Sequence, residues 1–123
     1  MNTEVLSIVF PLWLKAFAFT LALEIPLFVF VARIGRNGEK TCPIWRQVMA
    51  GACGTCFTHP LLWFVWPLII ADYTIYIVSG ELIIAIFESF TFFAIARPIT
   101  LRRAVAASFF ANAVSYGLGA LLH

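Results

Sequence analysis

Two glutamates interrupt apolar stretches of this sequence at equivalent places. Glu24 lies in an apolar run that ends at Arg33, and Glu88 lies in a second run that ends at Arg97. Both residue types repeat at an offset of 64 positions, because 88 − 24 and 97 − 33 give the same number. An ionisable side chain inside a membrane costs roughly 2.5–3.5 kcal/mol on insertion scales, and such residues usually mark a pathway or a relay. The spacing therefore predicts two functional carboxylates at one depth of a membrane.

Other polar residues fall at similar depths. An α-helix rises 1.5 Å per residue, so Glu24, Glu88 and Asn112 each lie about 13–14 Å from an arginine at a helix end. That distance is close to the middle of a hydrocarbon core about 30 Å thick. His59 is expected about one turn further from the arginines. The predicted polar centre of the bundle has these members: Glu24, His59, Glu81, Glu88, Asn112 and Ser115.

Two hypotheses from different classes explain such a centre. Two ionised acids at one depth repel each other, so Glu24 and Glu88 should share one proton or one cation, as in a transport or ion-passage module. The alternative is an accessory or assembly subunit of a larger membrane complex, in which polar groups such as Asn112 and Ser115 only link helices through hydrogen bonds. Replacing the acids with glutamine separates the two hypotheses.

A second motif is Cys53-x-x-Cys56 followed by His59. Positions i, i+3 and i+6 form one slanted stripe on a helix, and thiolates with an imidazole suit Cu(I) or Zn. A thiol- or metal-handling protein is therefore a third hypothesis, with a metal cation as its cofactor. The same spacing is a redox pair in a βαβ context, which is absent here. The alternative is packing, because Gly51 and Gly54 allow another helix backbone to approach.

Two prolines accompany the polar residues. Pro26 follows Glu24 by two positions, and Pro60 directly follows His59. A proline frees the carbonyl four residues back, and freed carbonyls line cation sites in broken membrane helices. The alternative is an ordinary kink, which neighbouring helices compensate.

Composition sets the class of protein. Of the 123 residues, 63% are hydrophobic and 11% are charged, and the mean hydropathy is +0.98. Soluble domains are about 45–50% apolar and about 25% charged, so the lipid bilayer is the expected partner. A net charge of +2 without a basic patch indicates no nucleic-acid binding. The sequence contains no HExxH, GxSxG or glycine-rich phosphate loop, so we expect no enzyme, although an intramembrane hydrolase using Glu and His remains an alternative.

The elements that must position these residues are membrane helices. The fold predicted for residues 1–123 is all-α: a single transmembrane domain, an integral membrane four-helix bundle. The basic loops 33–46 and 97–103 should be cytoplasmic, which places both termini outside a multi-pass protein of the cell membrane. The two tandem helical hairpins would then form a parallel repeat. Four helices are few for a complete pathway, so we expect a homo-oligomer or a larger membrane complex. The helices are predicted at about 11–32, 46–70, 74–96 and 102–122.

Overall fold

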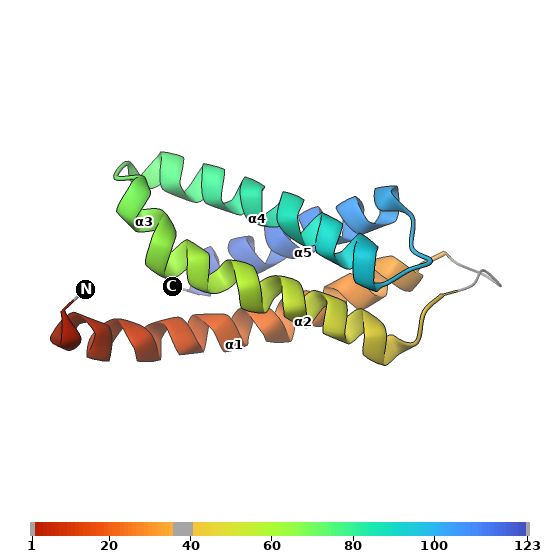
Figure 1. Ribbon diagram of the computed structural model, residues 1–123, viewed down its shortest axis with the longest axis horizontal. Helices are drawn as coiled ribbons and strands as arrows, with labels where there is room; N and C mark the ends of the chain where they lie inside the picture. The colour runs from red at the N-terminus through yellow and green to blue at the C-terminus, as the bar shows by residue number, and fades with distance from the viewer. Residues whose placement is uncertain (1, 36–40, 123) are drawn as a thin grey trace.

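The computed structural model describes residues 2–35 and 41–122, which form a bundle of four long helical segments (Figure 1). Each segment is long and apolar enough to span a membrane. The predicted all-helical fold is therefore confirmed, and the four candidate spans are compatible with a multi-pass membrane protein. Along the chain the elements are α1 (Thr3–Arg33), α2 (Ile44–Pro60), the π-helical turn η1 (Leu61–Val65), α3 (Trp66–Ile69), α4 (Tyr73–Ile95) and α5 (Leu101–Leu122).

The first helix is longer than the predicted segment 11–32. It begins at Thr3 because the side-chain oxygen of Asn2 accepts a hydrogen bond of 2.7 Å from the backbone N–H of Glu4. Such a cap satisfies one of the unpaired donors of the first turn. Pro11, the predicted first residue, instead lies inside the helix. The predicted residues 11–32 therefore lie within a helix that residues 3–10 extend by about two turns.

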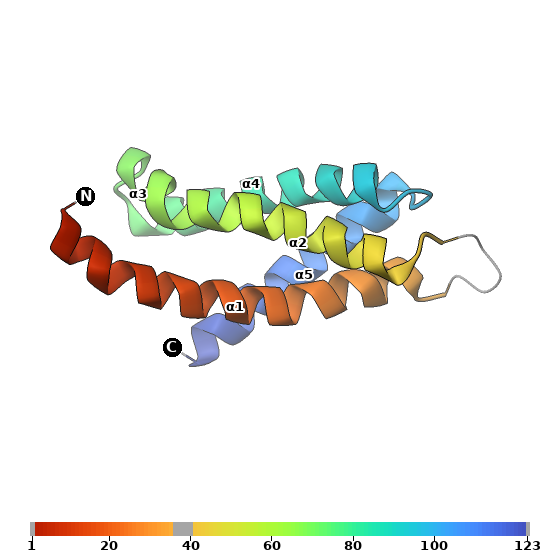
Figure 2. The same cartoon turned by 60° about the horizontal axis from the view of Figure 1, so that its bottom comes forward.

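The four segments form a ring in which α1 and α4 occupy opposite corners. Helix α1 packs against α2 and α5, and α4 packs against the same two helices. The start of α1 and the end of α5 lie at one end of the bundle, here called the terminal end (Figures 1 and 2). The end of α1, the start of α2 and the connection from α4 to α5 lie at the other end, here called the loop end.

The apolar core fills the loop-end half of the bundle, toward which the helices converge (Figure 1). Phe28 of α1 and Phe92 of α4 are fully buried, and their rings stack across the bundle with centroids 4.7 Å apart. Most of the other members are alanines, whose small side chains allow helices to pack closely in a membrane. The core residues are Phe28, Ala32, Cys42, Ala50, Phe92, Ala96, Ile99, Ala104, Ala107 and Ala111.

Arginine side chains strengthen the loop end. Nη1 of Arg103 donates hydrogen bonds to the carbonyl oxygens of Val31 and Ile34, at 2.9 and 2.6 Å. These carbonyls lie where α1 ends and the helix itself supplies no further donors. Arg103 therefore fastens the start of α5 to the end of α1. Two other cations of the predicted basic loop, Arg36 and Lys40, lie outside the described residues.

The second segment changes its winding after Pro60. The N–H of Trp66 bonds to the carbonyl oxygen of Leu61, five residues back, which defines a π turn. The hydroxyl of Tyr76 donates to the carbonyl of Leu62 at 2.8 Å, so the turn is anchored to α4. The structure thus has a π turn after this proline, and such turns are frequent at functional sites.

Candidate functional site

A cavity of about 600 Å³ lies in the terminal-end half of the bundle, where the apolar core is absent. It extends from the buried side chains of Glu24 and Glu88 to residues such as Tyr73 and Tyr116, which are exposed near the terminal end. The cavity therefore reaches residues that are exposed near the terminal end, and the apolar core lies on its loop-end side. Every member of the predicted polar centre lines it: Glu24, His59, Glu81, Glu88, Asn112 and Ser115.

Two carboxylates from opposite corners of the bundle form the floor of the cavity. Glu24 of α1 is 3% exposed and Glu88 of α4 is 2% exposed. The hydroxyl of Thr55 donates to Oε2 of Glu24 at 3.0 Å. Nδ2 of Asn112 donates to Oε2 of Glu88 at 2.8 Å. Side chains from α2 and α5 therefore hold the acids in place, while the functional role of these residues remains a prediction.

The hydroxyl of Thr58 makes two short contacts with oxygen atoms. Oγ1 of Thr58 lies 2.8 Å from Oε1 of Glu88 and 2.9 Å from the carbonyl oxygen of Gly54. A threonine hydroxyl has a single hydrogen, so it can make only one linear hydrogen bond, and sharing the hydrogen between both oxygens would weaken each bond. Two full hydrogen bonds at these distances therefore require a second hydrogen.

Sequence reasoning missed Thr55 and Thr58. Both lie on α2, three positions apart, and residues at that spacing are neighbours on one helix face. They precede His59 by four residues and by one residue, which places them at the depth of the glutamates. This depth was a usable signal, but threonine hydroxyls in helices often bond to their own backbone, as Thr91 does with Phe87.

Glycines of α2 allow the cavity floor to pack. A Cβ atom added at Gly54 would lie 3.1 Å from Cγ of Glu88, which is tighter than most real Cβ contacts. A Cβ atom at Gly51 would lie 3.5 Å from the ring of Phe28. The packing interpretation of Gly51 and Gly54 is thus confirmed, because both are close-approach positions of neighbouring helices.

His59 lies in the cavity wall among aromatic rings. It is 8% exposed, and its Nε2 is 3.4 Å from Oγ1 of Thr20. Its ring centroid lies 5.5 Å from that of Phe17 and 6.2 Å from that of Trp63. Within the described chain, its Nδ1 has no hydrogen-bond partner. This nitrogen is therefore a buried polar atom without a partner in the described chain.

The cysteines of the predicted metal motif lie apart from His59. Cys53 and Cys56 are exposed, whereas His59 is buried. Among residues 2–35 and 41–122, no three His, Cys, Asp or Glu side chains form a group that could hold a metal ion. The metal site at Cys53, Cys56 and His59 therefore stays a prediction from sequence spacing, without support from the geometry.

The cavity has an acidic and aromatic lining. Glu24, Glu81 and Glu88 contribute carboxylates, and no lysine or arginine lines the cavity in the described part of the chain. Clefts lined by one sign of charge concentrate ligands of the opposite sign. The aromatic residues of the lining are Phe19, His59, Trp63, Tyr73, Tyr76 and Tyr116.

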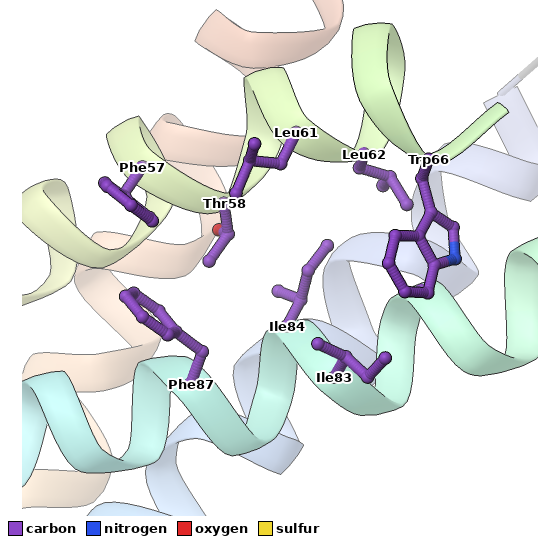
Figure 3. Close-up of a pocket in the computed structure, with 9 residues that line it drawn as sticks. Phe57, Thr58, Leu61, Leu62, Trp66, Ile83, Ile84 and Phe87 are labelled. Carbon is purple, nitrogen blue, oxygen red and sulfur yellow. The ribbon is translucent and has the colours of Figure 1, made fainter. Parts of the chain in front are cut away.

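A smaller apolar groove of about 100 Å³ lies between α2, η1 and α4 (Figure 3). Phe57 and Phe87 stack beside it with ring centroids 5.1 Å apart, and both are exposed on the outside of the bundle. Thr58, Leu62 and Ile84 line both this groove and the large cavity, so they form the wall between them. The groove offers contacts to lipid chains but no acid or base.

Comparison with known proteins found no matching family model, no matching curated protein and no matching solved structure. The interpretation of the cavity therefore depends on its chemistry. Buried carboxylates that line a cavity and are held by hydroxyl and amide donors can take up a proton or neutralise a cation.

Proposed function

We propose that the protein is a membrane transport module in which Glu24 and Glu88 bind a cation or a proton. The observation that carries this proposal is the cavity with two buried carboxylates at its floor. Acids that serve only to link helices need no cavity beside them. A volume of about 600 Å³ falls within the range of about 300–1,000 Å³ found for small-molecule sites.

The contacts of Thr58 support a site that holds a proton. If Oε1 of Glu88 carries a proton, this O–H donates to Oγ1 of Thr58. The Thr58 hydroxyl can then donate its own hydrogen to the carbonyl of Gly54, and both short contacts are satisfied. With Glu88 ionised, the two contacts would share a single hydrogen. In the proposed cycle, a cation entering the cavity displaces this proton.

The predicted internal repeat would allow the site to face one side of the membrane and then the other. Four pairs of residues share the offset of 64, and α1 and α4 occupy opposite corners of the bundle. This arrangement supports the predicted parallel repeat, with a pseudo-two-fold axis along the bundle. Repeats of this kind can rock against each other around a fixed site. The repeated pairs are Glu24/Glu88, Phe28/Phe92, Ala32/Ala96 and Arg33/Arg97.

The proposed orientation follows from the charged loops. Arg33, Arg97 and Arg103 lie at the loop end, and basic residues remain in the cytoplasm. The cavity would then open to the outside, where both termini lie, and the apolar core would separate the acids from the cytoplasm. We further propose that the protein acts as a homo-oligomer or within a larger membrane complex, because four helices are few to enclose a complete transport pathway.

One observation favours a second candidate function, that of an accessory subunit. Both carboxylate oxygens of Glu88 already contact partners within the chain, namely Thr58 and Asn112. A purely structural acid needs nothing more than such partners. In that role Glu88 would fix the packing of α2, α4 and α5, and the cavity would bind nothing.

Flux measurements on variants in proteoliposomes separate the two functions. Transport predicts that Glu24→Gln and Glu88→Gln fold normally but lose cation-dependent proton flux, and that the double variant is no worse than either single one. Glu4→Gln is the matched control, because Glu4 is exposed in the first turn of α1. If wild-type flux equals that of empty vesicles and the glutamine variants are only more stable, the accessory role is correct.

A further inference from the structure

We propose that the substrate of the cavity is an organic cation with an apolar body, such as a substituted ammonium ion, rather than an inorganic ion. This inference depends on the proposed function, because it names the cargo class of the same site. Three independent features of the cavity lead to it: the charge of its lining, the hydrogen-bonding state of its acids, and its aromatic wall.

The charge of the lining selects a positive ligand. Glu81 lies two helical turns from Glu88 on the same face of α4, toward the terminal end. The acids are therefore spread along the cavity from its floor toward its opening, and no lysine or arginine accompanies them among the described lining residues. An anion would find no cationic side chain along this path among the described lining residues, whereas a cation can pair with each acid that loses its proton.

The hydrogen-bonding state of the acids disfavours a bare metal ion. Divalent cations such as Ca²⁺ and Mg²⁺ need six or more oxygen ligands at about 2.0–2.6 Å. Here Thr55 and Asn112 present hydrogen-bond donors to the acids, and donors cannot serve as ligands in that orientation. The described residues also contain no metal-ligating group of three. The acids are therefore arranged to act as charges rather than as a coordination shell.

The aromatic wall suits a cation with an apolar body. Trp63, Tyr76 and Tyr116 line the cavity between its floor and its opening. Organic ammonium ions bind to the faces of such rings by cation–π attraction, most strongly to tryptophan. The cavity of about 600 Å³ also greatly exceeds the share of one water molecule, about 30 Å³. An inorganic ion is too small to contact most of these aromatic residues at once.

His59 provides an independent sign of a ligand. It is buried to more than nine-tenths and lines the cavity, yet its Nδ1 lacks a partner in the described chain. A buried polar atom without a hydrogen bond is costly. A turn of the imidazole ring would present this buried nitrogen to a polar group on the substrate, which would also orient the substrate relative to Glu88.

Calorimetry on the purified full chain in mild detergent tests this inference with defined probes. The probe is benzyltrimethylammonium, and its uncharged isostere is neopentylbenzene; KCl and ZnCl₂ represent inorganic cations. We expect saturable binding of benzyltrimethylammonium alone. Glu88→Gln should weaken it about tenfold or more, and Trp63→Leu should weaken it by about 3- to 30-fold. Trp45→Leu is the control, because Trp45 is exposed at the start of α2 and should change nothing.

Each failure has a distinct meaning. Binding of K⁺ or Zn²⁺ that depends on Glu88, without binding of benzyltrimethylammonium, overturns the organic-cation inference but leaves the proposed transport function in place. Equal binding of neopentylbenzene also overturns the inference, because the cavity would then recognise only apolar bulk. If none of the probes binds and no flux occurs in vesicles, both proposals fail.

Discussion

The ring of Phe28 stacks on the ring of Phe92, with centroids 4.7 Å apart and planes inclined by 25°. Each phenylalanine follows a floor glutamate by four residues, since Glu24 precedes Phe28 and Glu88 precedes Phe92. Residues at this spacing lie one turn apart on the same helix face. The stack therefore lies directly beneath the two acids and separates the cavity from the loop end of the bundle.

The first prediction concerns this aromatic seal. Phe28→Ala should open a path through the floor, so that vesicles containing the variant lose an imposed pH gradient faster than wild-type vesicles do. Removing a buried phenylalanine side chain also costs about 3–5 kcal/mol in soluble proteins, so the melting temperature in detergent should fall. Phe57→Ala is the matched control, because Phe57 stacks on Phe87 at the exposed side of the bundle. An unchanged gradient in the Phe28 variant would contradict the sealing role.

The second prediction concerns the close contact between α2 and α4. Gly54→Ala places a methyl group about 3.1 Å from Cγ of Glu88, and overpacking of this kind typically costs about 1–3 kcal/mol. We expect a lower melting temperature in detergent and weaker cation binding. Gly117→Ala should leave both unchanged, because a Cβ atom there meets nothing within 4 Å. Equal effects of the two alanine variants would show that the contact at Gly54 has no special importance.

The third prediction concerns the proton at Glu88. Infrared difference spectroscopy should detect the carbonyl stretch of a protonated carboxylic acid in the wild-type protein, and Glu88→Gln should abolish it. Thr58→Val keeps the side-chain shape but removes the hydroxyl between Glu88 and Gly54, so the band should shift to higher frequency. Thr91→Val should leave the band in place, because Thr91 bonds only to the carbonyl of Phe87 in its own helix. A spectrum without the band would refute the proposed protonation.

The level of the polar residues along the bundle could be counted from the sequence. Counting 1.5 Å per residue from the arginines placed Glu24, Glu88 and Asn112 at one level; all three line one cavity, and Asn112 donates to Glu88. Depth is a one-dimensional property that the helix rise and the bilayer thickness set together. The level of a residue therefore follows from its position in the sequence, without knowledge of how the helices pack.

Features that depend on how helices pack could not be predicted in the same way. The cavity exists because the helices spread toward the terminal end, and no single residue encodes that spread. Thr55 was overlooked because a hydroxyl in a membrane helix can satisfy itself on its own backbone. The start of α1 at Thr3 depends on the cap at Asn2, and Pro11 lies within the helix.

One measurement tests most directly whether a cation and a proton compete for the paired acids. Benzyltrimethylammonium is added to the purified protein in weakly buffered detergent solution near neutral pH, and the released protons are counted with a pH indicator dye. We expect about one proton released per cation bound, because two like charges at one site favour a single shared proton when the site is empty. Glu24→Gln and Glu88→Gln should each abolish the release, whereas Glu4→Gln should preserve it. Saturable cation binding without proton release, or release that persists in both floor variants, would contradict the exchange of cation and proton at Glu24 and Glu88.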